Sequence, residues 1–247
     1  YKDYLYEKLQ RKGILEKDCD KMVKSDRVTW GSCMVACGDA DGMVTGTTRH
    51  FSATVEKLAQ SVGTREKEIL FGLCLYVSKG KTILIADTNV IEYPTSEELV
   101  DITISSARIA EMLGFEPKVA LLSHSTFGQP ETDRTKRVRQ AVEMLKNKKV
   151  KFLFDGEMQP DVALNSKFKS TYPFSKIVGN ANVLVMPSIH AAAVSTKMLK
   201  ELGGGKVIGP LLIGLAQPIE VAPLRSSSSE ILNLASIAAY SSEVIKY

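Results

Sequence analysis

Several features that would assign the chain to a class at once are missing from its 247 residues. There is no apolar run near the roughly 20 residues that a membrane span needs, and no N-terminal signal sequence. The four cysteines (Cys19, Cys33, Cys37 and Cys74) lack the second pair or nearby histidine of a metal site. We therefore expect no membrane partner and no metal. Reduced thiols that act as small buried apolar groups indicate a cytoplasmic protein.

Charge of one sign is not concentrated anywhere either. The net charge is only +4, and lysine and arginine are spread along the chain. The nearest approach to a cluster, residues 134–139 with 146–151, is more typical of a solvated helix face than of a phosphate-binding patch. Nucleic-acid recognition would require a basic stripe with aromatic platforms, so nucleic acid is not an expected partner.

What the chain does contain is a regular alternation of strand and helix patterns. The first part predicts helices at residues 3–12, 17–25 and 27–37, a glycine-rich turn into a short strand, and a helix from Ser52, as its cap, to Val62. An antiparallel hairpin of strands 69–77 and 82–86 follows, turning at Lys79-Gly80.

The second part predicts further strands at 118–123, 152–154, around 183 and at 207–213. The helices between and after them are expected from Thr95 to Leu113 and at 133–148, near 162, at 190–202 and at 231–245, the last capped by Glu230. Short connections between alternating elements favour an α/β fold: a three-layer sandwich with a mostly parallel sheet.

Polar residues follow four of the apolar strands. The richest example is Asp155-Gly-Glu-Met-Gln-Pro-Asp161, directly after the run 152–154, and runs ending at Asp87, Ser123 and Pro187 share the pattern. Open α/β sheets place ligands at such strand ends, so we expect one cleft for a polar, phosphate-bearing small molecule. Taken singly, the loop 123–128 is as compatible with an ordinary capped loop as with a phosphate-binding loop. The acids of 155–161 are likewise as compatible with a favourable position at a helix N-terminus as with a role in the cleft.

Six short motifs carry a resemblance over nearly the whole chain. They occur in one order: Gly38-Asp-Ala-Asp-Gly-Met-Val-Thr-Gly46, Ala86-Asp-Thr88, Ala120-Leu-Leu-Ser-His-Ser-Thr-Phe-Gly128, Asp155-Gly-Glu-Met-Gln159, Ala181-Asn-Val-Leu-Val-Met-Pro187 and Gly209-Pro-Leu-Leu-Ile-Gly214. Together they resemble the phosphate acetyl/butyryltransferase family. Met158 and Phe127-Gly128 are more similar to the phosphotransacetylase-like C-terminal domain of large, bacterial-type NADP-dependent malic enzymes.

The resemblance implies a phosphotransacetylase-like fold, related to isocitrate and isopropylmalate dehydrogenases, with two subdomains around a cleft. Residues 1–68 and 225–247 would form part of the first subdomain, and residues 69–224 the second. Because the chain opens on Tyr1 instead of Met, next to an expected helix, and shows none of the family's earlier strands, we expect it to be a piece of a longer polypeptide.

The resemblance also implies a set of ligand-binding positions. Near the phosphates or acyl group it places the loop residues Ser123, Ser125, Thr126 and Gly128, with Asp155, Glu157 and Gln159 opposite. Asp39 and Asp41 would form the floor of the cleft, and Arg225 and Glu230 a charged pair near the C-terminus. No cofactor is expected in this domain. Acetyl-CoA or a related CoA ester is the expected effector, while NADP and a divalent metal belong to the upstream malic enzyme region.

Departures from the family pattern bear on activity. Active phosphotransacetylases carry a Ser-Arg pair after the Gly-Pro strand, where this chain has Pro223 and Leu224, and a family arginine aligns with Glu56. No catalytic residue is therefore predicted. We expect a regulatory, oligomerising module that senses acetyl-CoA. The alternatives are an active phosphate acetyltransferase using Arg225, and a pure assembly domain that pairs through the apolar helix 231–245.

Overall fold

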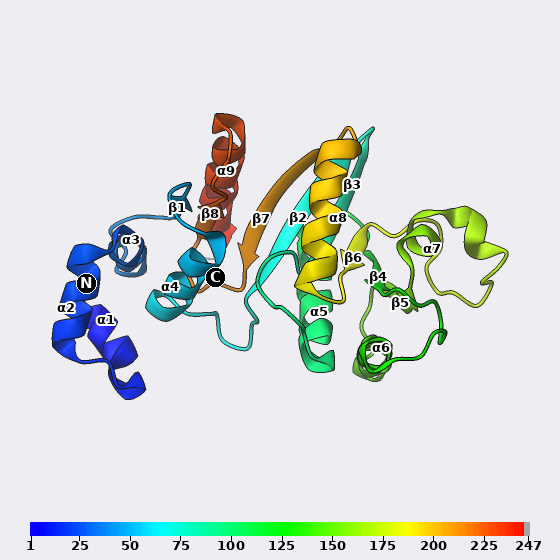
Figure 1. The fold of residues 1–247 in the computed structure, drawn as a ribbon, viewed down its shortest axis with the longest axis horizontal. Coiled ribbons are helices and arrows are strands. Elements are labelled where there is room, and N and C mark those ends of the chain that lie inside the picture. The colour runs from blue at the N-terminus through cyan, green and yellow to red at the C-terminus, as the bar shows by residue number, and fades with distance from the viewer. Residues whose placement is uncertain (245–247) are drawn as a thin grey trace. The chain divides into compact units, whose positions relative to one another are not determined.

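The computed structural model describes residues 1–244, which form two compact units (Figure 1). The first unit comprises Tyr1–Leu70 and Gly209–Tyr247, and the second comprises Phe71–Ile208. The sequence had placed the limits at residues 68/69 and 224/225. The difference at the second limit arises because a strand after residue 209 pairs with one near residue 44, as described below.

Helices dominate the first unit. Its elements are α1 (Lys2–Leu9), η1 (Gln10–Lys12), α2 (Glu16–Ser25), α3 (Arg27–Ala36), β1 (Met43–Gly46), α4 (Phe51–Ser61), β8 (Ile219–Ala222) and α9 (Ser228–Val244). The three predicted N-terminal helices and the short strand are confirmed. Ser52 is not a cap, because α4 already begins at Phe51, with His50 at the N-cap position.

Strand β8 was not predicted. It pairs in parallel with β1, with Val44 opposite Glu220, and α9 packs against both strands. Gly46 allows the close pairing, since a Cβ atom there would lie 2.1 Å from the Ala222 carbonyl oxygen. Helix α9 begins at Ser228 and not at the predicted residue 231, so Glu230 lies in its first turn and Ser227 precedes it. The two residues form a capping box: the Glu230 carboxylate accepts from the Ser227 N–H at 2.7 Å, and Ser227 Oγ accepts from the Glu230 N–H at 3.3 Å. The predicted helix end at Ile245 lies outside the described residues.

The second unit is built on a six-stranded sheet with the order β5-β4-β6-β3-β2-β7. Its strands are β2 (Phe71–Ser78), β3 (Lys81–Ala86), β4 (Lys118–Leu122), β5 (Leu153–Met158), β6 (Val183–Val185) and β7 (Lys206–Ile213), the last of which leads into the first unit. The pairs β4–β5, β4–β6 and β3–β6 are parallel, and β2–β3 is the predicted antiparallel hairpin. The mostly parallel sheet is thus confirmed.

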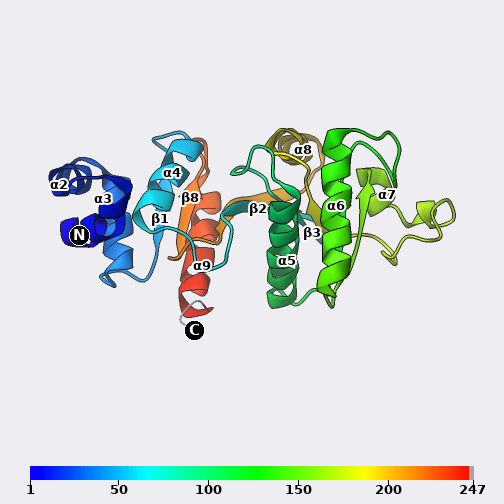
Figure 2. The same ribbon diagram turned by 90° about the horizontal axis from the view of Figure 1, so that it is seen from below.

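Helices cover both faces of this sheet. They are α5 (Ser96–Met112), α6 (Asp133–Lys148), α7 (Pro160–Leu164), η2 (Ser166–Lys169) and α8 (Ile189–Leu202). Residues of α7 and α8 pack on the face that bears Ile85, Ala120 and Leu184, and α8 lies along β3 (Figure 1). α5 and α6, side by side in Figure 2, contact the same strands, whose alternate residues such as Leu121 are also fully buried. Burial of both faces is what a three-layer α/β fold requires.

Two sequence-based details need correction. Strand β5 does not stop before Asp155 but continues to Met158, so the acidic segment begins inside the strand. Cys19, Cys33 and Cys74 are buried thiols as expected, but Cys37 is exposed at the end of α3. In the described part of the chain, no helix has the length and apolar character needed to cross a membrane, and no cluster of potential metal ligands occurs.

Candidate functional site

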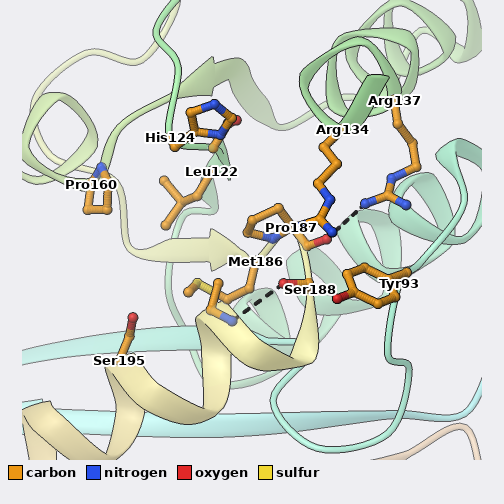
Figure 3. Close-up of a pocket in the computed structure, with 12 residues that line it drawn as sticks. Tyr93, Leu122, His124, Arg134, Arg137, Pro160, Met186, Pro187, Ser188 and Ser195 are labelled. Atoms are coloured by element: carbon orange, nitrogen blue, oxygen red, sulfur yellow. Dashed lines mark hydrogen bonds between the residues drawn. The ribbon is translucent and has the colours of Figure 1, made fainter. Parts of the chain in front are cut away.

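A cavity of about 280 Å³ lies in the second unit, where β4 and β6 end (Figure 3). Its walls come from both strand ends, from the helices α6, α7 and α8 and from the neighbouring loops. They consist of Tyr93, Leu122, Ser123, His124, Arg134, Arg137, Pro160, Met186, Pro187, Ser188, Ala191 and Ser195. The expected strand-end position is thus occupied by a pocket, with polar groups above an apolar floor.

Arg134 and Arg137 enter the pocket from the first turns of α6. They are three residues apart, so they share one face of the helix. Arg137 Nη2 donates to the Pro187 carbonyl oxygen at 3.3 Å, and the Arg134 guanidinium lies 5.1 Å from the ring centroid of Tyr93 (Figure 3). Both guanidiniums are therefore fixed by neutral partners, and their positive charge remains available to a ligand.

The first turn of α8 forms another wall of the pocket. Ser188 is its N-cap, and its Oγ accepts from the Ala191 N–H at 3.4 Å. The N-terminal end of this 14-residue helix adds partial positive charge on the side where Ser188 and Ala191 line the cavity. Together with the two arginines, this makes the pocket suited to an anion.

Glu157 holds the loop 123–128 in place. It is 1% exposed, and its Oε1 accepts from the Gly128 N–H at 2.8 Å and from Ser125 Oγ at 3.3 Å. Arg139 donates two hydrogen bonds to the same carboxylate, from Nε to Oε2 at 3.2 Å and from Nη2 to Oε1 at 3.1 Å. Burial alone would raise the pKa of Glu157, but the bonds from Arg139 and Gly128 lower it, so the carboxylate is charged. Glu157 thus supports the loop and does not line the cavity.

The other residues of the acidic segment are likewise engaged in the fold. Asp155 accepts from the Lys176 N–H at 2.7 Å and from the Gly156 N–H at 2.9 Å. Gln159 Nε2 donates to the His124 carbonyl at 3.0 Å, and the Gln159 N–H donates to Thr126 Oγ1 at 3.2 Å. These hydrogen bonds therefore attach the loop 123–128, which begins with Ser123, to the end of β5.

Asp87, directly after β3, is also hydrogen-bonded to the backbone. Its carboxylate accepts backbone N–H bonds from Gly72 at 2.7 Å, from Asn89 at 3.0 Å and from Ile91 at 2.5 Å. Of the four strand ends that were expected at one cleft, only those of β4 and β6 line the cavity. The ends at Asp87 and Asp155 do not line this cavity, and the predicted ligand role of Asp155 stays a prediction.

The remaining predicted ligand residues belong to the first unit. Asp39 accepts a hydrogen bond from the Tyr1 hydroxyl at 2.7 Å, which raises the pKa of Tyr1 to about 12. Asp41 and Arg225 are exposed, and Glu230 caps α9. Of the predicted set, only Ser123 lines the pocket of the second unit, while Ser125, Thr126 and Gly128 belong to the loop that begins with it.

Sequence reasoning missed most of the pocket. Arg134 and Arg137 were interpreted as a solvated face, although their spacing at the start of a helix after a ligand-type loop is a usable signal. Ser188 directly follows the strand end at Pro187, and its place before an apolar helix marks an N-cap. Tyr93 gives no sequence signal, because a loop without regular structure positions its ring.

The fold and site define an α/β protein of the phosphotransacetylase type. A family model described as phosphate acetyl/butaryl transferase matches residues 1–239. A phosphotransacetylase structure from Streptococcus pyogenes superposes with a TM-score of 0.89 and 30% identity, covering 98% of this chain and 75% of that one. The chain belongs to the phosphate acetyl/butyryl transferase family.

Two kinds of curated relatives match the chain. The NADP-dependent malic enzyme of Rhizobium meliloti is 48% identical over 240 residues, which is 97% of this chain but 32% of that enzyme. The phosphate acetyltransferase of Acetivibrio thermocellus is 32% identical over 256 residues, covering 100% of this chain and 76% of that enzyme. The chain thus spans about a third of the malic enzymes that it matches and about three quarters of the transferase.

Proposed function

We propose that the chain is a non-catalytic regulatory module that binds acetyl-CoA or a related CoA ester. The observation that carries this proposal is the sequence after β8. Where active transferases of the family have a Ser-Arg pair, Ala222 is followed by Pro223 and Leu224, and the Leu224 side chain is 48% exposed. A proline has no hydroxyl and a leucine no cation, so neither can hold an acyl phosphate.

The chemistry explains why this replacement decides against transfer. Moving an acetyl group between a thiol and phosphate develops negative charge on the carbonyl oxygen and brings a phosphate dianion to the reacting carbon. Removing one positioned donor from such a site costs roughly a hundredfold or more in rate. Here the hydroxyl and the guanidinium are both replaced, and Glu56 puts an acid in place of a further family arginine.

The similarity to malic enzymes supports the parent activity. We place the module in an NADP-dependent enzyme that oxidatively decarboxylates malate to pyruvate, with the NADP and divalent metal sites outside these 247 residues. Effector binding would act on that site through contacts between subunits of a homo-oligomer. By linkage, such an effect requires that the ligand bind two states of the assembly with different affinity.

Calorimetric titration of acetyl-CoA, with an assay of acetyl phosphate formation on the same sample, tests the proposal. We expect binding without turnover. A variant that restores the family pair, Pro223→Ser with Leu224→Arg, is the informative control, because a gain of turnover would assign the missing activity to these positions. Turnover by the unaltered chain would contradict the proposal.

Two other functions have an observation in their favour. Arg225 is exposed next to Leu224, which favours residual transferase activity; loss of turnover in Arg225→Ala would establish it. Leu232 and Tyr240 are exposed on α9, at 66% and 53%, which favours an assembly role. A folded chain that binds no CoA ester, and whose oligomers dissociate on Leu232→Lys, would leave assembly as the function.

A further inference from the structure

The charge of the strand-end pocket has one sign. Among the described residues that line it, Arg134 and Arg137 are cationic and none is acidic. Arg139, also on α6, differs from them: Glu157 and Glu131 accept its hydrogen bonds, with Nη1 at 3.1 Å from Glu131 Oε2. Within residues 1–244, Arg134 and Arg137 have no carboxylate partner of this kind. The pocket therefore holds two uncompensated guanidiniums.

Arg137 also has a donor without an acceptor. Its Nε is buried and makes no hydrogen bond within the described part of the chain, whereas Nη2 donates to the Pro187 carbonyl. A guanidinium matches two oxygens of a phosphate or carboxylate with parallel N–H bonds. A ligand oxygen beside Arg137 would provide the acceptor that the protein itself does not supply.

Hydroxyls from the two strand ends complete the donor set. Ser123 is 7% exposed and follows β4, and Ser188 follows β6 at the start of α8. Figure 3 shows Arg134 and Arg137 directed toward the strand end at Pro187 and Ser188. The charged donors thus come from one helix and the neutral donors from the strand ends.

Size restricts what the pocket can hold. Sites for whole drug-sized ligands measure roughly 300–1,000 Å³, and this cavity of about 280 Å³ is below that range. A complete CoA ester does not fit, but a phosphate group with its nearest atoms does. The apolar floor of Leu122, Met186 and Pro160 can contact carbon atoms next to the phosphate.

We propose that Arg134 and Arg137 form a phosphate-binding subsite, which recognises one phosphate group of a phosphorylated ligand. This inference deepens the proposed function and rests on it for the identity of the ligand: in a CoA ester, the subsite would hold the 3′-phosphate or the diphosphate, with the acyl group outside the pocket. Arg137 is the more important of the two, because it is partly buried and has the free donor.

Calorimetric titrations of inorganic phosphate, CoA and 3′-dephospho-CoA test the subsite. We expect Arg137→Ala to weaken phosphate and CoA binding about tenfold or more, and Arg134→Ala to weaken it several-fold. Lys148→Ala is the matched control, since it removes one exposed cation from the far end of the same helix and should change affinity less than about twofold. Arg137→Lys keeps the positive charge but cannot donate two parallel N–H bonds, and should therefore give an intermediate loss of affinity.

The outcomes separate this proposal from the proposed function. If acetyl-CoA binds with an affinity that none of the arginine substitutions alters, the subsite is wrong and the sensor function stands. If phosphate binds in an Arg137-dependent way and acetyl-CoA does not bind, the subsite stands and the CoA-ester function is wrong. Equal losses in Arg137→Ala and Lys148→Ala would show general charge attraction and overturn the subsite. A difference between CoA and 3′-dephospho-CoA that disappears in Arg137→Ala would identify the 3′-phosphate as the group bound.

Discussion

Among the described residues 1–244, each unit contains one buried glutamate on a strand, and the two have opposite surroundings. Glu157 of β5 is 1% exposed and is held by a guanidinium, a hydroxyl and a backbone N–H. Glu220 of β8 is 4% exposed, and its carboxylate accepts from the Leu212 N–H at 3.0 Å. Burial lifts the pKa of Glu220 to about 8, whereas the bonds to Glu157 outweigh burial and lower its pKa.

The comparison shows that depth alone does not decide whether a carboxyl is charged. The guanidinium and the other donors around Glu157 favour its ionised form, whereas burial with the single Leu212 N–H bond favours the protonated form of Glu220. In the second unit the charged carboxylate holds the loop 123–128 in place. In the first unit a neutral carboxyl group occupies a buried strand position.

The largest expected effect is the pH dependence that Glu220 gives to stability. Below the ordinary glutamate pKa both states hold the proton. Between that value and about 8 only the folded state does, so raising the pH favours unfolding. Stability should fall by up to about 1.4 kcal/mol per pH unit in this window and level off above it. Urea unfolding between pH 5 and 9 measures this slope, and Glu220→Gln should flatten it. An equal slope in that variant would contradict the assignment.

Removing the cation from the other site should make the two glutamates alike. Arg139→Ala leaves Glu157 buried without its cationic partner, and breaking a buried pair typically costs about 3–5 kcal/mol. Because the Arg139 side chain is 34% exposed, we expect about 3 kcal/mol at pH 7, measured by urea unfolding. The variant should also regain stability as the pH falls toward 5, since Glu157 can then accept a proton. Unchanged stability would mean that the loop, not the ion pair, holds this region.

A double substitution sharpens the same comparison. Glu157→Gln with Arg139→Met removes both charges and keeps an amide oxygen for the Gly128 N–H. We expect it to recover about 1–2 kcal/mol relative to Arg139→Ala, because no unpaired buried charge remains. The double-mutant cycle built with both single variants gives the coupling energy. A double variant no more stable than Arg139→Ala would show that lost packing, not lost charge, dominates.

The smallest effect is expected at the outer end of the same network. Lys136 pairs with Glu131 at 3.2 Å, and both side chains are about half exposed. Lys136→Ala should therefore change the free energy of unfolding by less than about 0.5 kcal/mol at moderate salt. A loss comparable with that of Arg139→Ala would contradict the distinction between buried and exposed pairs.

Much of the fold was predictable because local signals agree with tertiary structure. Helix α6 has the predicted bounds 133–148, and Thr95 forms a full capping box with Glu98. β8 was missed because four residues after a proline leave too little periodicity. The end of β5 was misplaced because Asp155 and Glu157 look like loop residues. Their burial depends on the Lys176 N–H and Arg139, partners distant in sequence.

The candidate site was predictable only in its location. Strand ends indicated a cleft, and Ser123 lies in it. The direction of a polar side chain depends on partners that a local pattern does not contain: Glu157 turns inward to Arg139, while Arg137 turns to the Pro187 carbonyl. The sequence analysis therefore predicted that Asp155 and Glu157 line the pocket. In the structure, Arg134 and Arg137 line it instead.

The parallel pairing of β1 with β8 has a consequence for the order of folding. Val44 finds its partner Glu220 only after the whole of residues 71–208 has left the ribosome. Strands β2 to β6 lie within that stretch, so most of the second unit can fold while β1 is still unpaired, because β8 has not yet been synthesised. Long-range pairing slows folding and leaves a strand edge open to other chains in the meantime. During synthesis we expect a nascent intermediate in which the strand-end cavity has formed and the first unit is incomplete, with chaperone contacts concentrated around residues 43–46.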